Sequence, residues 1–237
     1  MPWLIAHYLP VGLFSLKDSQ ATSTGGKSLL VPTPFAVRMA LLDAALRVEG
    51  RAHAQAIFDA IRPLDLALRP PERAAVSGLL VKVLKPERAD SAKAKQRFFL
   101  KTIAFREYVH WQGPLALAFG GEHGTLAQVR AWLPHITYLG KRGGFVQLLA
   151  PPQQVEALPQ DFVPLKDTGL GQREVATFTL GLLQRLDEWG PSLTWERVNI
   201  YSDEKIRPGK DRVAIVVSVP YRMTRAGRGF TVYQRAA

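Results

Sequence analysis

The sequence of 237 residues contains no cysteine, so disulfide bonds and thiolate metal sites are excluded. No apolar stretch approaches the roughly 20 residues that a membrane-spanning helix needs, and low-complexity runs are absent. Because 47% of the residues are hydrophobic, we expect a globular protein with one large domain or two small ones. These absences favour a cytoplasmic protein that does not associate with membranes.

Motifs for metal binding and nucleophilic catalysis are also missing. The five histidines show no spacing typical of metal ligands, and neither a paired-aspartate pattern nor a GxSxG pattern occurs. We therefore expect no metal and no cofactor. The opening MPWLIAHYLPVGLF is apolar, but no basic residue precedes it and it contains His7 and Pro10. It predicts a first strand within residues 3–14 rather than a signal peptide.

The stretch ATSTGGKSL at residues 21–29 ends in the Gly-Lys-Ser of a nucleotide-binding P-loop. That motif requires a glycine where this chain has Ala21, and it must open directly into a helix. Here the sequence Pro32-Thr33-Pro34 intervenes, and the residue before a proline avoids helical geometry. The helix can therefore start only near Pro34, and an NTPase is excluded.

Positive charge is abundant and unevenly distributed. Lysine and arginine outnumber aspartate and glutamate by 31 to 20, which gives a net charge of +11. Residues 76–110 carry +5 and residues 205–237 carry +7, whereas the rest of the chain carries −1. A surface that is charged only for solubility would spread its charge evenly. The two basic blocks therefore predict two nucleic-acid contact zones, with solvated faces as the alternative.

Hydrophobic periodicity predicts an α+β protein. Expected helices cover residues 34–50, 52–61, 122–133 and 179–189; expected strands cover residues 64–68, 76–84, 105–111, 114–119, 213–219 and 230–233. The order strand, helix, strand, strand, helix, strand predicts a ferredoxin-like (RRM-like) fold for residues 1–150. The proline-rich residues 150–164 predict a linker, followed by a smaller, β-rich C-terminal portion at residues 165–237.

Residues 86–96 are charged and rich in alanine, without an apolar period, and therefore predict the exposed tip of a protruding arm. Residues 98–103 are expected to lead back to the body. A second loop, between two apolar runs, predicts a hairpin with a basic, glycine-flanked turn. Its glycines would let the backbone approach phosphate oxygens while its two cations bind them; the alternative is a simple exposed turn. The turn consists of Gly140, Lys141, Arg142, Gly143 and Gly144.

A metal-free ribonuclease would need a His or Tyr base and a Lys or His acid. Three sets of residues could in principle supply these groups: His7 with Tyr8, His110, or Tyr138 with Lys141. A lone His or Tyr on a strand more often serves in packing, so we expect no catalysis.

Taken together, several segments resemble the Cas-five family of CRISPR proteins, part of the RAMP superfamily. They are LLVPTPFAVRMALLDAAL, the basic arm, RFFLKTIAFREYVHW, YLGKRGGFV and VPYRMTRAGRGFTVYQR. The resemblance implies RAMP-type ferredoxin-like folding with a glycine-rich loop, and a thumb that maps to about residues 77–101. It also implies a noncatalytic subunit of a Cascade complex that caps the 5′ handle of the crRNA. The implied partners are the crRNA, the Cas-seven backbone subunit and the large subunit, with target DNA nearby.

On this basis the opening loop would meet RNA phosphates rather than ATP. The residues that we expect to contact RNA are Lys27, Ser28, Arg38, Lys101, Arg106, Gly140, Lys141, Arg142, Gly143 and Gly144. Two alternatives remain open. One branch of the family cuts pre-crRNA with a Tyr, Lys and His set that cannot be matched here, and an unrelated basic scaffold, such as a ribosome-associated factor, would share the charge.

Overall fold

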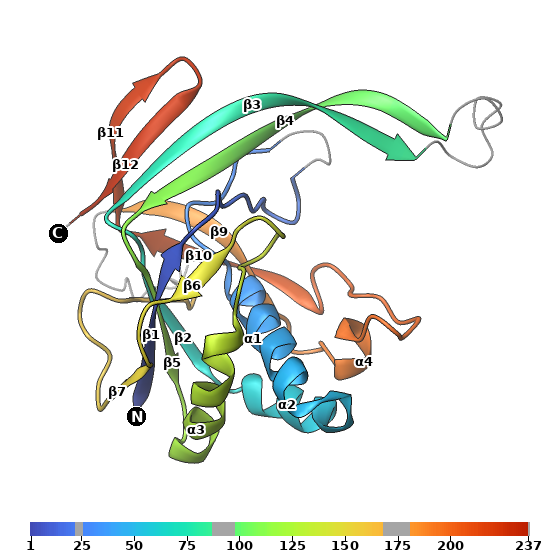
Figure 1. The fold of residues 1–237 in the computed structure, drawn as a ribbon, viewed down its shortest axis with the longest axis vertical. Helices are drawn as coiled ribbons and strands as arrows, with labels where there is room; N and C mark the ends of the chain where they lie inside the picture. The colour runs from blue at the N-terminus through green and yellow to red at the C-terminus, as the bar shows by residue number, and fades with distance from the viewer. Residues whose placement is uncertain (22–25, 87–97, 168–180, 237) are drawn as a thin grey trace, which may run out of the picture.

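The computed structural model describes residues 1–21, 26–86, 98–167 and 181–236 (Figure 1). Its first sheet is formed by short strands from the first two thirds of the chain. The elements that build this unit are β1 (Trp3–Pro10), α1 (Pro34–Glu49), α2 (Ala54–Ile61), β2 (Asp65–Arg69), β5 (Leu115–Gly120), α3 (His123–Trp132) and β6 (Val146–Leu148). Single 3-10 turns precede α2 (Arg51–His53) and follow α3 (Leu133–His135).

The strand order β6-β1-β5-β2, with every neighbouring pair antiparallel, is that of a ferredoxin-like sheet. Helices α1 and α3 supply the two crossovers and lie together on one face of the sheet (Figure 1). The predicted fold class is therefore confirmed. The main departure from the minimal pattern is the long β3–β4 hairpin, which is inserted between β2 and β5.

Alternation along β1 explains why the helices cover one face of the sheet. Leu4, Ala6 and Tyr8 point to the helical side and are fully buried in the main core. Ile5 points to the opposite face, where a smaller core contains Phe162 and three alanines of the sheet. Both faces of the sheet are therefore packed.

Helix α1 begins and ends where the sequence predicts. The Thr33 hydroxyl accepts a hydrogen bond from the Ala36 amide at 3.1 Å, and Pro34 occupies the first turn. At the other end Gly50 adopts a positive φ of 85° and donates its amide to Leu46 O at 3.0 Å. Because the helix starts six residues after Ser28, the Gly-Lys-Ser sequence does not cap a helix, which agrees with the exclusion of a P-loop.

The predicted arm is present as a two-stranded hairpin. Strands β3 (Arg73–Pro86) and β4 (Phe99–Gln112) pair antiparallel over their full lengths and extend far from the body (Figure 1). The returning segment expected at residues 98–103 and the strand predicted at residues 105–111 are thus one continuous strand from Phe99 onward. Apart from Pro86, the predicted tip at residues 86–96 lies outside the described residues.

The prediction of a linker at residues 150–164 is wrong. Strand β7 (Gln153–Val155) pairs with β1, and β8 (Val163–Pro164) pairs with β2. Between them, Phe162 packs into the smaller core. Prolines are tolerated here because these short strands each pair with one strand, at the edges of the sheet. This segment covers the face of the sheet that the helices leave open.

The C-terminal portion contains β9 (Leu182–Trp189), α4 (Trp195–Val198), β10 (Arg212–Val219), β11 (Tyr221–Gly227) and β12 (Phe230–Arg235). The prediction of a helix at residues 179–189 is wrong from Leu182 onward, since this stretch is strand β9; residues 179 and 180 lie outside the described part. Leu182 and Leu186 do have helical spacing. The segment is nevertheless a strand, because eight of its residues pair with β10, which is rich in β-branched side chains. Strand β12 pairs with β3 and widens the base of the arm.

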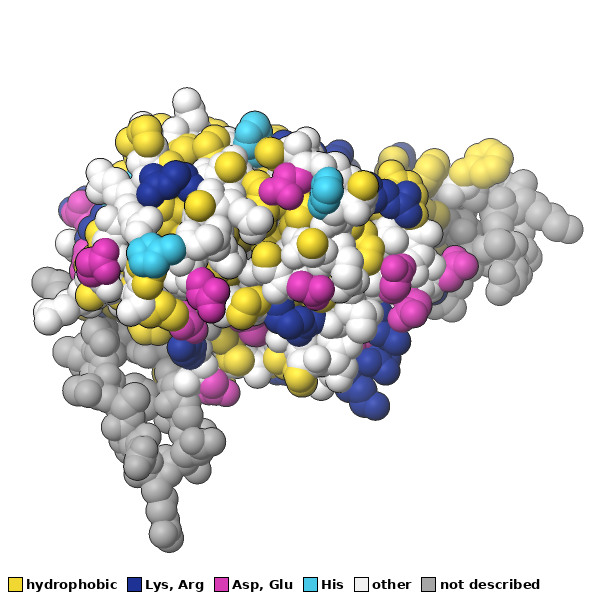
Figure 2. All heavy atoms as spheres, turned by 90° about the horizontal axis from the view of Figure 1, so that it is seen from below, with side chains coloured by type: hydrophobic (Ala, Val, Ile, Leu, Met, Phe, Trp, Pro, Cys, Tyr) yellow, Lys and Arg dark blue, Asp and Glu magenta, His cyan; other side chains and the backbone are white. Residues whose placement is uncertain are grey.

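The end of the molecule away from the arm presents a mixed surface. Figure 2 shows acidic, basic and histidine side chains interspersed there among apolar ones. None of the helices in the described part of the chain has the length and apolar character that crossing a bilayer requires.

Candidate nucleic-acid interface

The opening segment, residues 11–17, connects the base of the arm to the glycine-rich turn. Phe14 exchanges two backbone hydrogen bonds with Val109 of β4, at 2.9 and 2.7 Å, and its ring stacks on Trp111 at 4.3 Å. Val11 donates its amide to Phe145 O at 2.9 Å, just after the turn. Three segments that are distant in the sequence therefore meet at one place.

The glycine-rich turn adopts the conformation that its sequence predicts. Gly140 and Gly143 have positive φ angles of 71° and 107°, which L side chains rarely adopt. Leu139 donates to Gly144 O at 3.0 Å, and Tyr138 and Phe145 form a bridge, so the loop closes as a very short hairpin. Two apolar runs were expected to form the strands of this hairpin. The first contributes a single bridge residue, Tyr138, and only the second contains a longer strand, β6.

Close packing explains part of the glycine content. A Cβ atom on Gly12 would lie 2.2 Å from Gly143 O, and a Cβ on Gly140 would lie 3.2 Å from the Leu16 side chain. At Gly143, by contrast, a Cβ atom would have nothing within 4 Å, so this glycine faces open space. The turn is thus held against the opening segment on one side and accessible on the other.

Cationic side chains from all three segments gather here. Burial, together with the nearby charges of Arg106 and Lys141, lowers the pKa of Lys17. Lys17 belongs to the opening segment, Arg106 to β4 and Lys141 to the turn, and the neighbouring Arg142 is exposed. Such a convergence of like charges is unfavourable by itself and favours an anionic ligand. We call Lys17, Arg106, Lys141 and Arg142 the cationic cluster.

The other predicted contacts from the opening loop lie elsewhere. Lys27 is exposed and lines a separate hollow of about 410 Å³ between this loop and β9. The expectation that Ser28 contacts phosphate is corrected, because Ser28 is only 8% exposed and structural. Its amide donates to Glu107 Oε2 at 2.6 Å, and its hydroxyl accepts from the Leu16 amide at 3.2 Å.

The prediction that Arg38 binds RNA is also corrected. Its side chain is buried, and all five N–H donors have partners inside the protein. Nε and Nη2 donate to Glu188, while Nη1 and Nη2 donate to backbone carbonyls in the last residue of α2 and just after it. Arg38 therefore ties α1 to β9 and to the end of α2, and leaves no donor for a phosphate.

Lys101 is exposed but lies apart from the cationic cluster. It is five residues from Arg106 on the same strand, a separation of about 17 Å, and alternation directs the two side chains to opposite faces. The structure thus brings together Arg106 and the turn, but not Lys101, Lys27 or Arg38.

A hollow of about 480 Å³ adjoins the cationic cluster. Lys141 lines it together with Phe35 and Met39 of α1 and with Arg212 of β10. The Arg212 guanidinium lies 4.6 Å from the centre of the Phe35 ring and donates to Asp187 at 2.6 Å. Neither the position of Lys17 nor the contact between Arg212 and Phe35 could be predicted from the sequence, since nothing near Lys17 or Phe35 marks them as neighbours of the turn.

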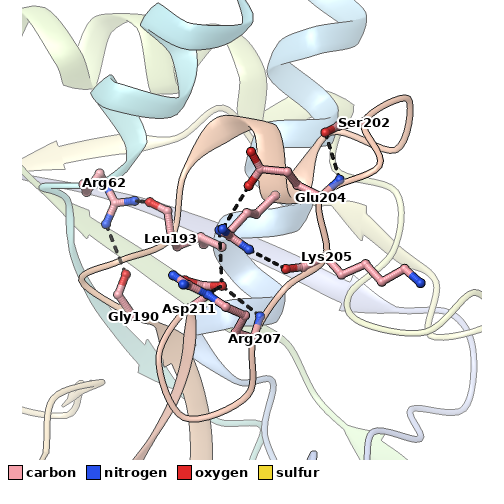
Figure 3. Close-up of polar contacts among 9 residues, drawn as sticks. Arg62, Gly190, Leu193, Ser202, Glu204, Lys205, Arg207 and Asp211 are labelled. Carbon is pink, nitrogen blue, oxygen red and sulfur yellow. Dashed lines mark hydrogen bonds and ion pairs between the residues drawn. The ribbon is translucent and has the colours of Figure 1, made fainter.

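Part of the second basic block is bound to carboxylates within the protein. Figure 3 shows the loop before β10, where Asp211 is fully buried and receives hydrogen bonds from the backbone and the guanidinium of Arg207. These bonds, the attached charge and nearby Arg197 hold the pKa of Asp211 well below its usual value. In the same view Arg62 donates to the carbonyls of Gly190 and Leu193. Several cations of this region therefore serve structure.

The candidate catalytic residues are mostly separated. Tyr8 is buried, donates its hydroxyl to Leu133 O at 2.8 Å, and has a pKa raised by burial. His7 points to the other face of the sheet, where burial and the charge of Arg69 lower its pKa. His110 is exposed on β4. Tyr138 and Lys141 alone among these sets line one hollow together.

Comparison with known proteins gives one significant curated relative. Over 108 residues the chain is 31% identical to the CRISPR-associated protein Cas5 of Archaeoglobus fulgidus. The resemblance to the Cas-five family is confirmed over this stretch. The match covers 45% of this chain and 46% of the relative, so the chain spans about half the length of the curated relative it matches. No protein-family model matches the sequence.

Solved structures of CRISPR proteins resemble the chain at low identity. A crystal structure of a CRISPR protein from Archaeoglobus fulgidus aligns with 100% of this chain and 93% of its own, at 12% identity and a TM-score of 0.44. A chain of a CRISPR RNA-guided surveillance complex aligns with 63% of this chain and 61% of its own, at 17% identity and a TM-score of 0.40.

Proposed function

We propose that this chain is a noncatalytic, crRNA-binding subunit of a Cascade-type CRISPR surveillance complex, and that it caps the 5′ handle of the crRNA. The observation that carries the proposal is the cationic cluster beside the glycine-rich turn, whose Gly143 faces open space. The local match to a Cas5 protein supports the choice of RNA over other polyanions.

Binding would rest mainly on phosphates. The exposed side chains of Lys141 and Arg142 offer charge and a guanidinium fork, and the open backbone at Gly143 allows close approach. Such contacts retain a strand without reading its bases. The turn and the base of the arm would thus form the surface along which the single-stranded handle binds.

The arm would reach the neighbouring backbone subunit, the Cas-seven protein, while the body contacts the large subunit near the target DNA. Support for a protein contact comes from apolar side chains on the outer arm, among which Leu80 is 76% and Ile103 is 61% exposed. The apolar residues on either side of the arm's tip do not secure its base, because they are exposed: Leu79, Leu80, Phe98, Phe99 and Leu100. Large exposed apolar surfaces of this kind favour association.

We further propose that the chain does not cut RNA. Tyr138 and Lys141 share a hollow, but no histidine lines it, so the Tyr, Lys and His set by which one branch of the family cuts pre-crRNA is not assembled there. A labelled repeat RNA should remain intact after incubation with the purified protein, with or without divalent ions. Cleavage at one position that is abolished in Tyr138→Phe would establish the nuclease alternative.

The decisive experiment is co-expression with a CRISPR array and the other subunits, followed by purification and sequencing of the bound RNA. We expect one defined small RNA with a common, repeat-derived 5′ end. The Lys141→Ala/Arg142→Ala variant should recover less of it, whereas Lys166→Ala, which removes a cation paired with Asp65, should recover as much as wild type. Recovery of ribosomal RNA instead would favour the basic scaffold.

A further inference from the structure

The hollow beside the cationic cluster differs chemically from the cluster itself. Phe35, Ala36, Met39 and Ala40 of α1 form its apolar wall, and Tyr138 lines it from the turn side. Its volume of about 480 Å³ lies in the range of small-ligand sites. A site for phosphate alone would not need an apolar wall of this size.

Arg212 gives the hollow a flat, preorganised surface. Its guanidinium is stacked 4.6 Å from the Phe35 ring centre and fixed by the 2.6 Å bond to Asp187. The side chain nevertheless remains 29% exposed. Aromatic rings and guanidinium planes are the surfaces on which proteins stack unpaired bases of single-stranded RNA.

Lys141 connects this hollow to the cationic cluster, because it lines the hollow and also belongs to the cluster. A phosphate bound at Lys141 would therefore place the attached nucleoside at the mouth of the hollow. Asp43 lies on the wall and pairs with Arg47 at 3.2 Å, so its charge is partly compensated. Its carboxylate can accept a hydrogen bond from the amino group of a base.

We infer that this hollow accepts one unstacked nucleobase of the bound strand, stacked on Arg212 and enclosed by the apolar wall of α1. The inference rests on the proposed RNA-binding function and extends it: the cluster holds the backbone, and the hollow holds a base. A side chain of a partner protein is the competing occupant. The shared residue Lys141 favours the base, because backbone and base are covalently joined.

The test compares a single-stranded RNA with an abasic ribose-phosphate strand of equal length and charge, by fluorescence anisotropy. Wild type should prefer the RNA by about fivefold or more, the lower end of what stacking of one base contributes. Ala40→Phe, which fills the hollow, should lower that preference at least fivefold and leave binding of the abasic strand unchanged. Ala56→Phe, at an exposed position of α2, is the matched control and should behave as wild type.

The outcomes separate the two proposals. If wild type binds neither strand, the proposed function fails and this inference with it. If it binds both strands equally, or if Ala40→Phe weakens both equally, RNA binding stands and the base site is wrong. Cross-linking of wild type with 5-iodouridine-substituted RNA needs no variant. We expect adducts on Phe35 or Tyr138, and adducts confined to other residues would overturn the inference.

Discussion

The two halves of the β3–β4 hairpin have the same local structure and different surroundings. Residues directly opposite each other in an antiparallel pair share a face, so Val76 and Val109 face the same way as Leu80 and Phe105 further out. At the base this face is core, with Val109 fully buried. On the outer half the same face is solvent-exposed, with Leu80 at 76%.

Strand pattern and burial are therefore separate properties of this hairpin. The apolar alternation predicts a strand with one buried face, but it does not say what buries it. At the base the opening segment supplies cover, because the Phe14 ring stacks on Trp111, which shares the face of Val109. On the outer half none of the described residues covers this face to the same extent. The outer face is thus the part of the arm most suited to a partner.

The largest predicted effect contrasts the two halves directly. Trp111→Ala at the base should lower the free energy of unfolding by about 3–5 kcal/mol, because it removes a buried ring that stacks on Phe14 and donates to Leu30 O at 2.8 Å. Leu80→Ala on the outer half should change it by less than about 0.5 kcal/mol. Urea denaturation measures both. Equal losses would mean that the outer half is also packed in solution.

The second prediction contrasts two cations. Arg38→Met should destabilise the protein by about 3 kcal/mol, because it removes the cation paired with Glu188 and the donor to the carbonyls of Ile61 and Leu64. Lys141→Met, at an exposed site, should leave stability within about 0.5 kcal/mol of wild type. Thermal or urea unfolding distinguishes the two. A loss of less than about 1 kcal/mol in Arg38→Met would show that the buried hydrogen bonds of Arg38 contribute little to stability.

The third prediction concerns assembly. Deleting residues 86–96 and closing the gap with a short glycine turn should leave the free energy of unfolding of the monomer within about 0.5 kcal/mol of wild type. Assembly with crRNA and the other subunits should be abolished or strongly reduced, as judged by co-purification. The Leu84→Ser/Ile103→Ser variant tests the outer face without shortening it. If both variants assemble normally, the arm is a passive loop.

The fourth prediction separates the cationic cluster from the rest of the surface. Removing one phosphate contact should reduce the slope of log K against log salt by about 0.7 for a single strand. Lys141→Ala/Arg142→Ala should therefore flatten the slope by about 1.4, and Lys166→Ala should leave it unchanged. Binding titrations of single-stranded RNA at several salt concentrations provide the slopes, and an unaltered slope in the double variant would exclude the turn as a phosphate site.

The smallest effect is a dependence on pH. Because the pKa of Asp211 is lowered in the folded state, its ion pair stabilises the protein above the ordinary carboxyl pKa of 3.8. This contribution disappears as the pH falls below that value towards the folded-state pKa. In Arg207→Ala the free energy of unfolding should fall less steeply as the pH is lowered, which urea unfolding between about pH 2.5 and 6 would measure. An unchanged pH profile would argue against this pair.

Where local chemistry was strong, the sequence was sufficient to predict structure. Thr33, Pro34 and Gly50 mark both ends of α1, and the order of strands and helices predicted the ferredoxin-like sheet. The failures arose where pairing overrode local preference. Leu182 and Leu186 have helical spacing, yet they lie in β9 because β10 pairs with it, and the prolines of residues 150–164 did not prevent β7 and β8 from joining the sheet.

The candidate site was predictable only in part, for the same reason. The glycines and cations of the turn are adjacent in the sequence, so residues 140–144 were identified directly. The neighbourhood of Lys17, Arg106 and Lys141 was not, because the three residues come from separate segments. Arg38 was misassigned because its charge is evident from the sequence and its five internal partners are not.

By itself the sequence determined what depends on neighbouring residues: the caps of α1, the glycines of the turn and the uneven distribution of charge. The tertiary structure alone decided which cations are exposed and which form ion pairs and hydrogen bonds with carboxylates and carbonyls inside the protein. It also decided which apolar faces are covered, and that Lys141 joins the cationic cluster to the hollow of α1. Burial and charge pairing depend on contacts between distant segments, and periodicity along one segment carries no information about them.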